Sequence, residues 1–235
     1  MEDKLQAEII EIIDESSRVK RFQFRLVNVY KFEFEPGQFV IIDFPGIDHT
    51  FPYRSYSISS TTKRHKTLEI CVVLKEDGCA SPLLFKANIG DRYSLSLPQG
   101  KFILPKEIDR DLCFICTGTG VAPFRSMILN IYEQNLKHKN IYLYFGNRME
   151  EDILYRTEFE ELEISYPEFN FIPVLSQEEW AGANGYLHPY YLEEFKDKRE
   201  AYFYICGWTE MVREAKNNLK ALGYDRRSIK IELYD

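Results

Sequence analysis

The chain has 235 residues, of which 45% are hydrophobic and 29% are charged, and its formal net charge at pH 7 is −7. This composition is typical of a packed globular protein, and the length allows one large domain or two of ordinary size. The acidic balance argues against a nucleic-acid partner, because phosphate binding needs a clustered basic surface.

Membrane and export signals are not evident in the sequence. No apolar stretch approaches the ~20 residues of a membrane-spanning helix. The opening residues, MEDKLQAEII, lack the basic head and apolar core of a signal peptide. The five cysteines, an odd number, favour free thiols over a disulfide framework. We therefore expect a cytoplasmic protein without a membrane span.

Residues 5–97 are typical of short strands separated by turns. Apolar and polar residues alternate with period two, as at Phe22, Phe24 and Leu26. The segments that show this pattern are AEIIEII, VKRFQFRL, PGQFVIIDF, YRSYSIS, LEICVVL and DRYSLSL. Because no helical pattern interrupts them, they predict an antiparallel barrel or sandwich.

Two local basic runs, RVKRFQFR at 18–25 and KRHK at 63–66, contrast with the acidic net charge. The interpretation that we favour is a pair of solvated strand edges and a loop. The alternative is a docking patch for an acidic protein partner, which charge steering would support.

After about residue 110, strand-like segments alternate with helix-like segments. The apolar runs lie at 112–116, 141–145, 170–175, 202–206 and 229–233. The clearest helix covers 209–222, with Thr209 as a cap at its start and Gly223 as a left-handed residue at its end. Five strands alternating with helices predict an α/β, doubly wound, five-stranded parallel sheet. We place the boundary between the two halves near 104–111.

Cys113 and Cys116 form a CxxC motif inside the apolar run LCFICTG, which is the pattern of a buried strand. A redox or zinc role is therefore not favoured for them. The sequence has no second CxxC and its four histidines are scattered, so we expect no metal site. The cysteines also lack the close spacing of a plant-type iron–sulfur domain.

The segment CTGTGVAPFRSM at 116–127 joins a predicted buried strand to a predicted helix that begins near Pro123. Gly118 and Gly120 allow a tight turn and a close approach of the backbone to a ligand. The helix N-terminus behind them offers free N–H groups to a pyrophosphate. The full GxGxxG pattern is not present, since Pro123 stands at the third glycine. From the residues alone, the turn is either a phosphate site or an ordinary strand-to-helix turn.

TGTGVAPFRSM resembles the nucleotide-binding motif of the ferredoxin–NADP reductase family. Further segments resemble motifs of that family in the same order along the chain, namely PGQF (36–39), RSYSISS (54–60), GCAS (78–81), CGWTEM (206–211) and IELY (231–234). Each match alone is weak, but together they span almost the whole chain. The resemblance implies an FAD-binding antiparallel β-barrel domain over 1–106 and an NAD(P)-binding α/β domain over 107–235.

At the flavin, the resemblance implies that Arg54 pairs with the pyrophosphate, Tyr56 lies against the isoalloxazine and Ser57 hydrogen-bonds flavin N5. Strand periodicity puts Arg54 and Tyr56 on one face, which suits these roles. Without the other motifs, this strand would be an ordinary half-buried hairpin. The GCAS turn and Arg54 together suit a pyrophosphate, so we expect FAD rather than FMN. The further positions implied to border FAD are Cys71, Val72, Val73, Gly78, Ala80 and Ser81.

For the nicotinamide nucleotide, the resemblance implies a second set of positions. The implied ligand-binding residues are Thr117, Gly118, Thr119, Gly120, Asn147, Arg148, Cys206 and Gly207. Cys206 is implied to lie beside the nicotinamide with Ser57 and Glu232, and these three are the implied catalytic side chains. Tyr234 is implied to lie over the exposed isoalloxazine face. A buried strand cysteine is usually a small apolar residue, so the role of Cys206 depends on the resemblance.

Acidic residues favour NADH over NADPH. NADP-specific relatives commonly have a Ser-Arg pair after the third parallel strand. The matching stretch here, VLSQEEWAGANGY, keeps Ser176 but has Gln177, followed by Glu178 and Glu179. The stretch GNRMEED adds Glu150 and Glu151. These carboxylates would repel a 2′-phosphate, whereas Arg148 would attract it.

The implied activity is that of an FAD-dependent reductase, which passes hydride from NAD(P)H to flavin N5 and then electrons to a separate carrier such as ferredoxin or flavodoxin. One alternative is a free-flavin reductase, which binds flavin only transiently. Another alternative is an electron-transfer subunit of a larger complex.

Overall fold

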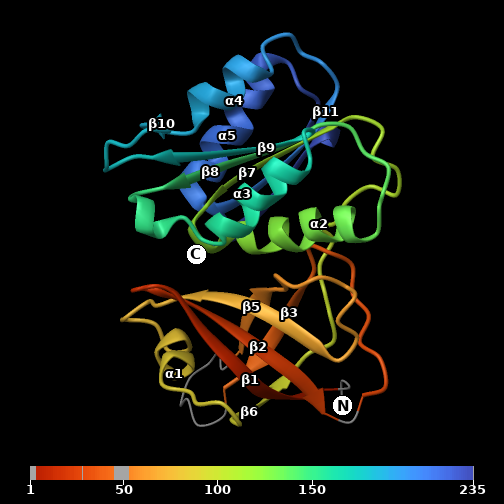
Figure 1. Ribbon diagram of the computed structural model, residues 1–235, viewed down its shortest axis with the longest axis vertical. Coiled ribbons are helices and arrows are strands. Elements are labelled where there is room, and N and C mark those ends of the chain that lie inside the picture. The colour runs from red at the N-terminus through yellow and green to blue at the C-terminus, as the bar shows by residue number, and fades with distance from the viewer. Residues whose placement is uncertain (1–3, 28, 45–52, 235) are drawn as a thin grey trace. The chain divides into compact units, whose positions relative to one another are not determined.

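The computed structural model describes residues 4–27, 29–44 and 53–234, and its contacts divide the chain into two compact units (Figure 1). The first, which we call the barrel unit, combines Met1–Leu104 with Ala122–Asn135. The second, which we call the sheet unit, combines Pro105–Val121 with Leu136–Asp235. Helix α2 (Ala122–Glu133), which follows the Gly-rich turn in sequence, therefore groups with the barrel unit.

The barrel unit is built on a six-stranded antiparallel sheet in the order β4-β3-β6-β1-β2-β5. Its strands are β1 (Leu5–Ser16), β2 (Val19–Val27), β3 (Phe39–Asp43), β4 (Tyr53–Ser57), β5 (Thr67–Val73) and β6 (Arg92–Leu95). A further antiparallel bridge, between Ile58 just after β4 and Ile70 in β5, joins the two edge strands. The sheet therefore closes on itself, and the predicted antiparallel barrel is confirmed.

Period-two alternation builds the core of the barrel. In β2, Phe22, Phe24 and Leu26 are buried, whereas the residues between them are partly or fully exposed. Burying each of these side chains contributes about 1.5–3 kcal/mol. The short helix α1 (Ser81–Phe85) adds Leu84 to the same core.

The sheet unit holds a six-stranded parallel sheet in the order β10-β9-β8-β7-β11-β12. Its strands are β7 (Asp111–Thr117), β8 (Ile141–Asn147), β9 (Phe169–Leu175), β10 (Ala183–Asn184), β11 (Ala201–Trp208) and β12 (Ile229–Tyr234), and its helices are α3 (Arg156–Ser165), α4 (His188–Glu194) and α5 (Thr209–Leu222). The doubly wound parallel architecture is confirmed, but the predicted number of five strands is wrong. The sixth strand, β10, has only two residues, which is too short to give a periodic signal in the sequence.

Helix α5 covers the predicted range 209–222, and Gly223 ends it in the left-handed conformation (φ 108°), as predicted. Thr209 is not the cap that the sequence suggested. It is the first helical residue, and Trp208 holds the cap position without a side-chain hydrogen bond. The buried stripe of the helix consists of Met211, Val212, Ala215 and Leu219.

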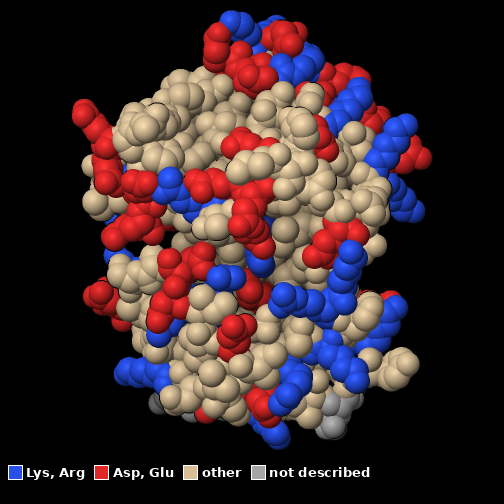
Figure 2. All heavy atoms as spheres, viewed as in Figure 1, with Lys and Arg blue, Asp and Glu red and all other residues tan. Residues whose placement is uncertain are grey.

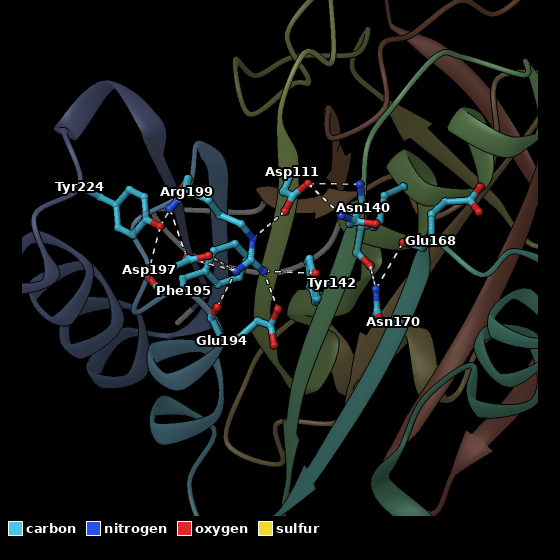
Figure 3. A network of polar contacts seen from close by, with 11 residues as sticks. Asp111, Asn140, Tyr142, Glu168, Asn170, Glu194, Phe195, Asp197, Arg199 and Tyr224 are labelled. Carbon is cyan, nitrogen blue, oxygen red and sulfur yellow. Dashed lines mark hydrogen bonds and ion pairs between the residues drawn. The ribbon is translucent and has the colours of Figure 1, made fainter.

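A polar network around Arg199 holds the amino ends of the parallel strands (Figure 3). Arg199 donates from Nε to Asp111 Oδ2 at 2.9 Å and from Nη2 to Tyr142 Oη at 3.2 Å. Asp111 Oδ1 accepts from the backbone N–H and from Nδ2 of Asn140, each at 3.3 Å. The Tyr224 hydroxyl donates to the Arg199 carbonyl at 2.9 Å. Both oxygens of the buried Asp111 carboxylate are therefore paired, and we call this group of contacts the base network.

Charges of both signs lie close together on the surface drawn in Figure 2. In the basic run 18–25, Arg21 pairs with Glu15 at 2.5 Å and Arg25 with Glu8 at 2.6 Å. These pairs neutralise the two arginines within the barrel unit, but the interpretation of this run as a strand edge is wrong, because β2 pairs with β1 on one side and β5 on the other. Over the described ranges, no helix is long and apolar enough to cross a bilayer. Within the same residues, no three His, Cys, Asp or Glu side chains gather as a metal site.

Candidate cofactor-binding sites

The predicted flavin residues Arg54, Tyr56 and Ser57 lie on β4, in the barrel unit. Strand pairing sets Arg54 opposite Ile42 and Tyr56 opposite Val40, two core residues of β3, so Arg54 and Tyr56 share a face. Tyr56 packs against that core, and burial raises the pKa of its phenol well above the ordinary value. The ring therefore stays neutral, as a surface against an aromatic ligand requires. Ser57, at the end of the strand, is buried.

Arg54 reaches the GCAS turn. Its guanidinium donates from Nη2 to Cys79 Sγ at 3.1 Å and from Nη1 to the Tyr53 carbonyl at 2.7 Å. The structure thus brings together two segments that the sequence separates, and it adds Cys79, which the sequence did not single out. The only sequence signal for Cys79 is its place inside the GCAS motif.

The GCAS turn forms hydrogen bonds with the main chain of Lys75. Ser81 Oγ accepts from the Lys75 N–H at 2.9 Å and donates to the Lys75 carbonyl at 3.3 Å. The Gly78 N–H donates to the same carbonyl at 2.8 Å, and Ala80 is buried. The Ser81 hydroxyl therefore shapes the turn itself. The other implied flavin positions, Cys71, Val72 and Val73, form the end of β5.

The Gly-rich turn leaves β7 at the point where the strand order of the sheet reverses, between β7 and β11. In open α/β sheets, this crevice at the carboxyl ends of the strands is where ligands bind. The turn passes through a short 3-10 helix, Gly118–Val121, and α2 begins at Ala122, close to the predicted start near Pro123. Gly118 is left-handed (φ 52°), and a Cβ added to it would meet no atom of the described residues within 4 Å, its chain neighbours aside. This part of the backbone is open to a ligand.

The Gly-rich turn touches the Cys-Gly motif of β11 backbone to backbone. A Cβ at Gly120 would lie 2.5 Å from the Cys206 carbonyl oxygen, and a Cβ at Gly207 (φ 134°) would lie 2.4 Å from Thr117 Oγ1. Thr117 Oγ1 also accepts from the Trp208 N–H at 3.1 Å. Only glycine fits at these two positions. Two predicted ligand motifs, far apart in sequence, therefore form one surface in the sheet unit.

Asn147 ends β8, and the residue before it, Gly146, pairs with Thr117 of the turn. The Asn147 side chain is only 8% exposed, and its Nδ2 donates to the Phe145 carbonyl at 3.1 Å. Its Oδ1 has no hydrogen-bond partner among the residues that the structure describes. An unsatisfied buried acceptor costs about 1–3 kcal/mol, so this oxygen suits a donor on a ligand. Together with the open backbone at Gly118, it fits a nicotinamide nucleotide.

Cys206, Glu232 and Tyr234 come together at the ends of β11 and β12. Register pairs Cys206 with Glu232 and Trp208 with Tyr234. Burial raises the pKa of the Cys206 thiol well above its ordinary value, the Glu232 charge adds to this, and a hydrogen bond with the Tyr234 side chain opposes it. Burial therefore favours the neutral thiol, which suits contact with a ring.

An acidic cluster lies at the loops after β8 and β9. The Glu150 N–H donates to Glu178 Oε2 at 2.7 Å, so two of the predicted acidic residues meet. Arg156 forms ion pairs with Glu150 and, at 2.7 Å, with Glu160. The Arg156 guanidinium also lies 5.7 Å from the ring centroid of Trp180. The sequence-based prediction did not include Arg156 or Trp180. The sequence signal for this cluster is the i,i+4 spacing of Arg156 and Glu160, which is typical of an ion pair on a helix.

Comparison with known proteins assigns these features to a family. The sequence matches the oxidoreductase FAD-binding domain over residues 6–103 and the oxidoreductase NAD-binding domain over residues 114–217. The crystal structure of a ferredoxin NADP+ reductase from Neisseria gonorrhoeae with bound FAD and NADP is 25% identical, with a TM-score of 0.83 over 97% of each chain. The chain belongs to the ferredoxin–NADP reductase family. Its two matched regions are those of an FAD-binding and an NAD-binding oxidoreductase domain.

Two curated proteins are similar to this chain over almost its whole length. Ferredoxin–NADP reductase B of Sorangium cellulosum is 28% identical over 99% of this chain and 98% of that protein. The phenol hydroxylase P5 protein of Acinetobacter pittii is 30% identical over 97% of this chain. The chain spans 65% of the length of the Acinetobacter protein.

Proposed function

We propose that the chain is a reductase that uses FAD to carry electrons from NAD(P)H, with NADH preferred, to a separate protein such as ferredoxin or flavodoxin. The observation that carries this proposal is the backbone contact between the turn 117–120 and the pair Cys206–Gly207, beside the unpaired acceptor of Asn147. This contact lies at the switch point of the parallel sheet, which is where open α/β sheets bind ligands. When bound, FAD supplies the chemistry, since it accepts hydride at N5 and releases electrons to an acceptor.

On the flavin side, we propose that the barrel unit binds and orients FAD. Arg54 pairs with the pyrophosphate, Tyr56 packs on the isoalloxazine and Ser57 hydrogen-bonds N5. The contact of Arg54 with Cys79 at 3.1 Å supports this, because it aims the guanidinium at the GCAS turn. The remaining proposed FAD contacts are the strand positions Cys71, Val72 and Val73 and the turn positions Gly78, Ala80 and Ser81.

On the nucleotide side, we propose that the sheet unit holds NAD(P)H and orients the nicotinamide. Cys206 packs beside the ring as a neutral thiol, and Glu232 supplies a carboxylate next to it. The Asn147 Oδ1 accepts a hydrogen bond from the ligand, which satisfies it. The other proposed contacts are Thr117, Gly118, Thr119, Gly120, Arg148 and Gly207.

We propose that Tyr234 contacts the flavin ring face at which nicotinamide must bind. It is the last residue of β12, an edge strand that pairs on one side only, with β11. A side chain on such a strand moves aside with less loss of contacts than one in the middle of a sheet.

The preference for NADH depends on the acidic cluster of Glu150 and Glu178, with Glu151 and Glu179 beside them. A carboxylate ~5 Å from a 2′-phosphate costs about 3 kcal/mol at an effective dielectric near 20, and less once salt screens it. Arg156 pairs with Glu150 and so offsets part of this charge. We propose that Arg148, which is exposed, does not compensate for the remainder.

We propose that residues 1–106 form the FAD-binding domain, that residues 107–235 form the NAD(P)-binding domain, and that the chain works in the cytoplasm. The two domain matches, at 6–103 and 114–217, support the division.

A second candidate function is that of an electron-transfer component in an oxygenase system. The names of two matching proteins favour it, namely the phenol hydroxylase P5 protein and the electron transfer component of an anthranilate 1,2-dioxygenase.

Gel filtration followed by flavin analysis tests the proposal. We expect about one FAD per chain to remain bound, and heat should release FAD rather than FMN. NADH should bleach the flavin, and ferricyanide should sustain turnover. Flavin that separates from the protein, with activity only on added free flavin, would indicate a free-flavin reductase. Bound flavin that neither NADH nor NADPH bleaches would refute the proposal. A pull-down, followed by NADH-driven reduction of the captured protein, identifies the acceptor.

A further inference from the structure

Buried polar side chains of the barrel unit gather between the segment that follows β4 and helix α2. The members of this group, which we call the polar seam, are Ser59, Ser60, Thr61, Glu69, Arg125 and Ser126. They lie beside a cluster of buried hydrophobic residues that forms the barrel core. A group of this kind is costly to bury, so its arrangement calls for an explanation beyond packing.

The centre of the polar seam is an ion pair between Glu69 of β5 and Arg125 of α2. Glu69 is 4% exposed and Arg125 is 8% exposed. Arg125 Nη1 lies 3.1 Å from Glu69 Oε1, and the same oxygen accepts from Ser59 Oγ at 3.0 Å. Arg21 Nη1 lies 3.6 Å from the other carboxylate oxygen of Glu69.

Side chains of the polar seam form hydrogen bonds with the main chain just after Ser57. Arg125 Nη1 donates to the Ser59 carbonyl at 2.9 Å, and Ser126 Oγ donates to the Ser60 carbonyl at 2.7 Å. The Ser59 N–H donates to the Glu69 carbonyl at 2.8 Å. The backbone that directly follows Ser57 is therefore held from both β5 and α2.

Stability alone does not account for this ion pair. Replacing a buried ion pair by apolar side chains of similar volume is often neutral or stabilising. What charged hydrogen bonds add is direction, because each one fixes a donor and an acceptor at defined positions. In this seam the fixed positions are main-chain atoms two and three residues beyond Ser57.

We propose that Glu69 and Arg125 are positioning residues for Ser57, which hold its hydroxyl in the orientation that flavin N5 requires. This inference depends on the proposed role of Ser57 in FAD binding. Neither residue touches the flavin itself in this proposal. Their effect reaches the cofactor through the backbone of Ser57, Ile58 and Ser59.

The test compares Glu69→Gln and Arg125→Met with Asp111→Asn. Asp111 is an equally buried carboxylate, paired with Arg199 at 2.9 Å in the base network of the sheet unit (Figure 3). Stopped-flow bleaching by NADH gives the maximal rate and the NADH affinity for each FAD-loaded protein. We expect the two seam variants to slow the maximal rate at least tenfold, to leave NADH affinity within twofold and to shift the visible flavin bands. Asp111→Asn should lower the melting temperature without changing the rate or the spectrum.

Two further variants separate positioning from stability. Arg125→Lys, which keeps the charge, should recover part of the rate and spectrum. In the double variant Glu69→Gln with Arg125→Met, the melting temperature should return toward the wild-type value, whereas the maximal rate of flavin bleaching should stay as low as in the single variants. Seam variants that lose stability as Asp111→Asn does, with wild-type rate and spectrum, would overturn the inference.

Hydrogen–deuterium exchange of the flavin-free protein gives a readout that does not need FAD. Glu69→Gln should speed exchange of the backbone amides at 57–60, and Asp111→Asn should not. Unchanged exchange at 57–60 would overturn the inference even if FAD binds. A wild-type chain that binds no FAD would instead refute the proposed function.

Discussion

The two ends of the parallel sheet are built differently, although the same strands form both. At the amino end, the buried Asp111 carboxylate uses both oxygens, and Arg199, Asn140, Tyr142 and Tyr224 complete the base network. At the carboxyl end, glycine replaces side chains, the backbone is open at Gly118, and Asn147 Oδ1 has no partner among the described residues.

This difference separates stability from binding within one sheet. A satisfied network of charges rigidifies a fold but offers nothing to a ligand. An open turn with an unpaired acceptor reduces stability, and a bound ligand can restore that loss. Substitutions at the amino end should therefore change stability, and those at the carboxyl end should change nucleotide binding.

The largest expected effect is that of Arg199→Met. This substitution leaves the buried Asp111 carboxylate without its cation, and breaking such a pair costs about 3–5 kcal/mol. We expect the urea midpoint of unfolding to fall accordingly, while the NADH affinity of the folded protein stays within twofold. A loss of NADH affinity larger than the loss of stability would show that the two ends are not independent.

At the carboxyl end, Gly120→Ala should lower NADH affinity more than it lowers the stability of the fold. Its Cβ would lie 2.5 Å from the Cys206 carbonyl oxygen and would push the Cys-Gly motif away. Overpacking of this kind costs about 1–3 kcal/mol. If displacement of the Cys-Gly motif transfers this cost to the bound state, NADH affinity falls by roughly 5- to 150-fold. Equilibrium titration of the flavin spectrum with NADH measures it.

Gly90→Ala is the matched control for Gly120→Ala. Gly90 is left-handed (φ 98°), and a Cβ there would meet nothing within 4 Å, so alanine is strained only in its backbone. This variant should lose stability and retain NADH affinity. Equal affinity losses in the two variants would mean that the contact between the turn and Cys206 does not shape the site.

The acidic cluster gives a further test of this comparison, because negative charge at the carboxyl end of the sheet should favour NADH over NADPH. We expect the wild-type kcat/KM to be roughly 5- to 150-fold higher for NADH than for NADPH, since Glu178 and Glu150 would repel a 2′-phosphate by about 1–3 kcal/mol after screening. Glu178→Gln should reduce the ratio of kcat/KM for NADH to kcat/KM for NADPH several-fold. Glu160→Gln is the control, because Glu160 lies on α3 and pairs with Arg156 at 2.7 Å, and it should leave that ratio unchanged. A higher kcat/KM for NADPH would contradict the assignment and identify Arg148 as the phosphate ligand.

Local periodicity was sufficient to predict most of the fold. Phe22, Phe24 and Leu26 alternate in sequence and are buried in the barrel, and the stripe of α5 is buried in the sheet unit. These elements are specified by their own residues, because burial follows the period of the backbone. β10 was missed because two residues have no period.

What periodicity could not predict depends on contacts between distant segments. Helix α2 groups with the barrel unit, and its Arg125 pairs with Glu69, which lies far away in sequence. The missing partner of Asn147 Oδ1 is likewise a property of the folded neighbourhood. The candidate site was therefore found from motifs, whereas its physical features became visible only in the structure.

The smallest expected effect is at Tyr234. An aromatic stack contributes about 0.5–1.5 kcal/mol beyond burial, so if this ring competes with nicotinamide for the flavin, removing it should strengthen oxidised-nucleotide binding by up to about tenfold. Tyr234→Ser should therefore tighten NAD+ binding and shift the visible flavin bands, with the melting temperature nearly unchanged because the residue lies at the end of an edge strand. Glu232→Ala, two residues earlier on the same face, is the contrasting variant, and it should slow flavin bleaching without releasing FAD. A Tyr234→Ser protein with wild-type spectrum and affinity would show that the ring does not contact the flavin. Its contact with Cys206 would then belong to the sheet unit alone.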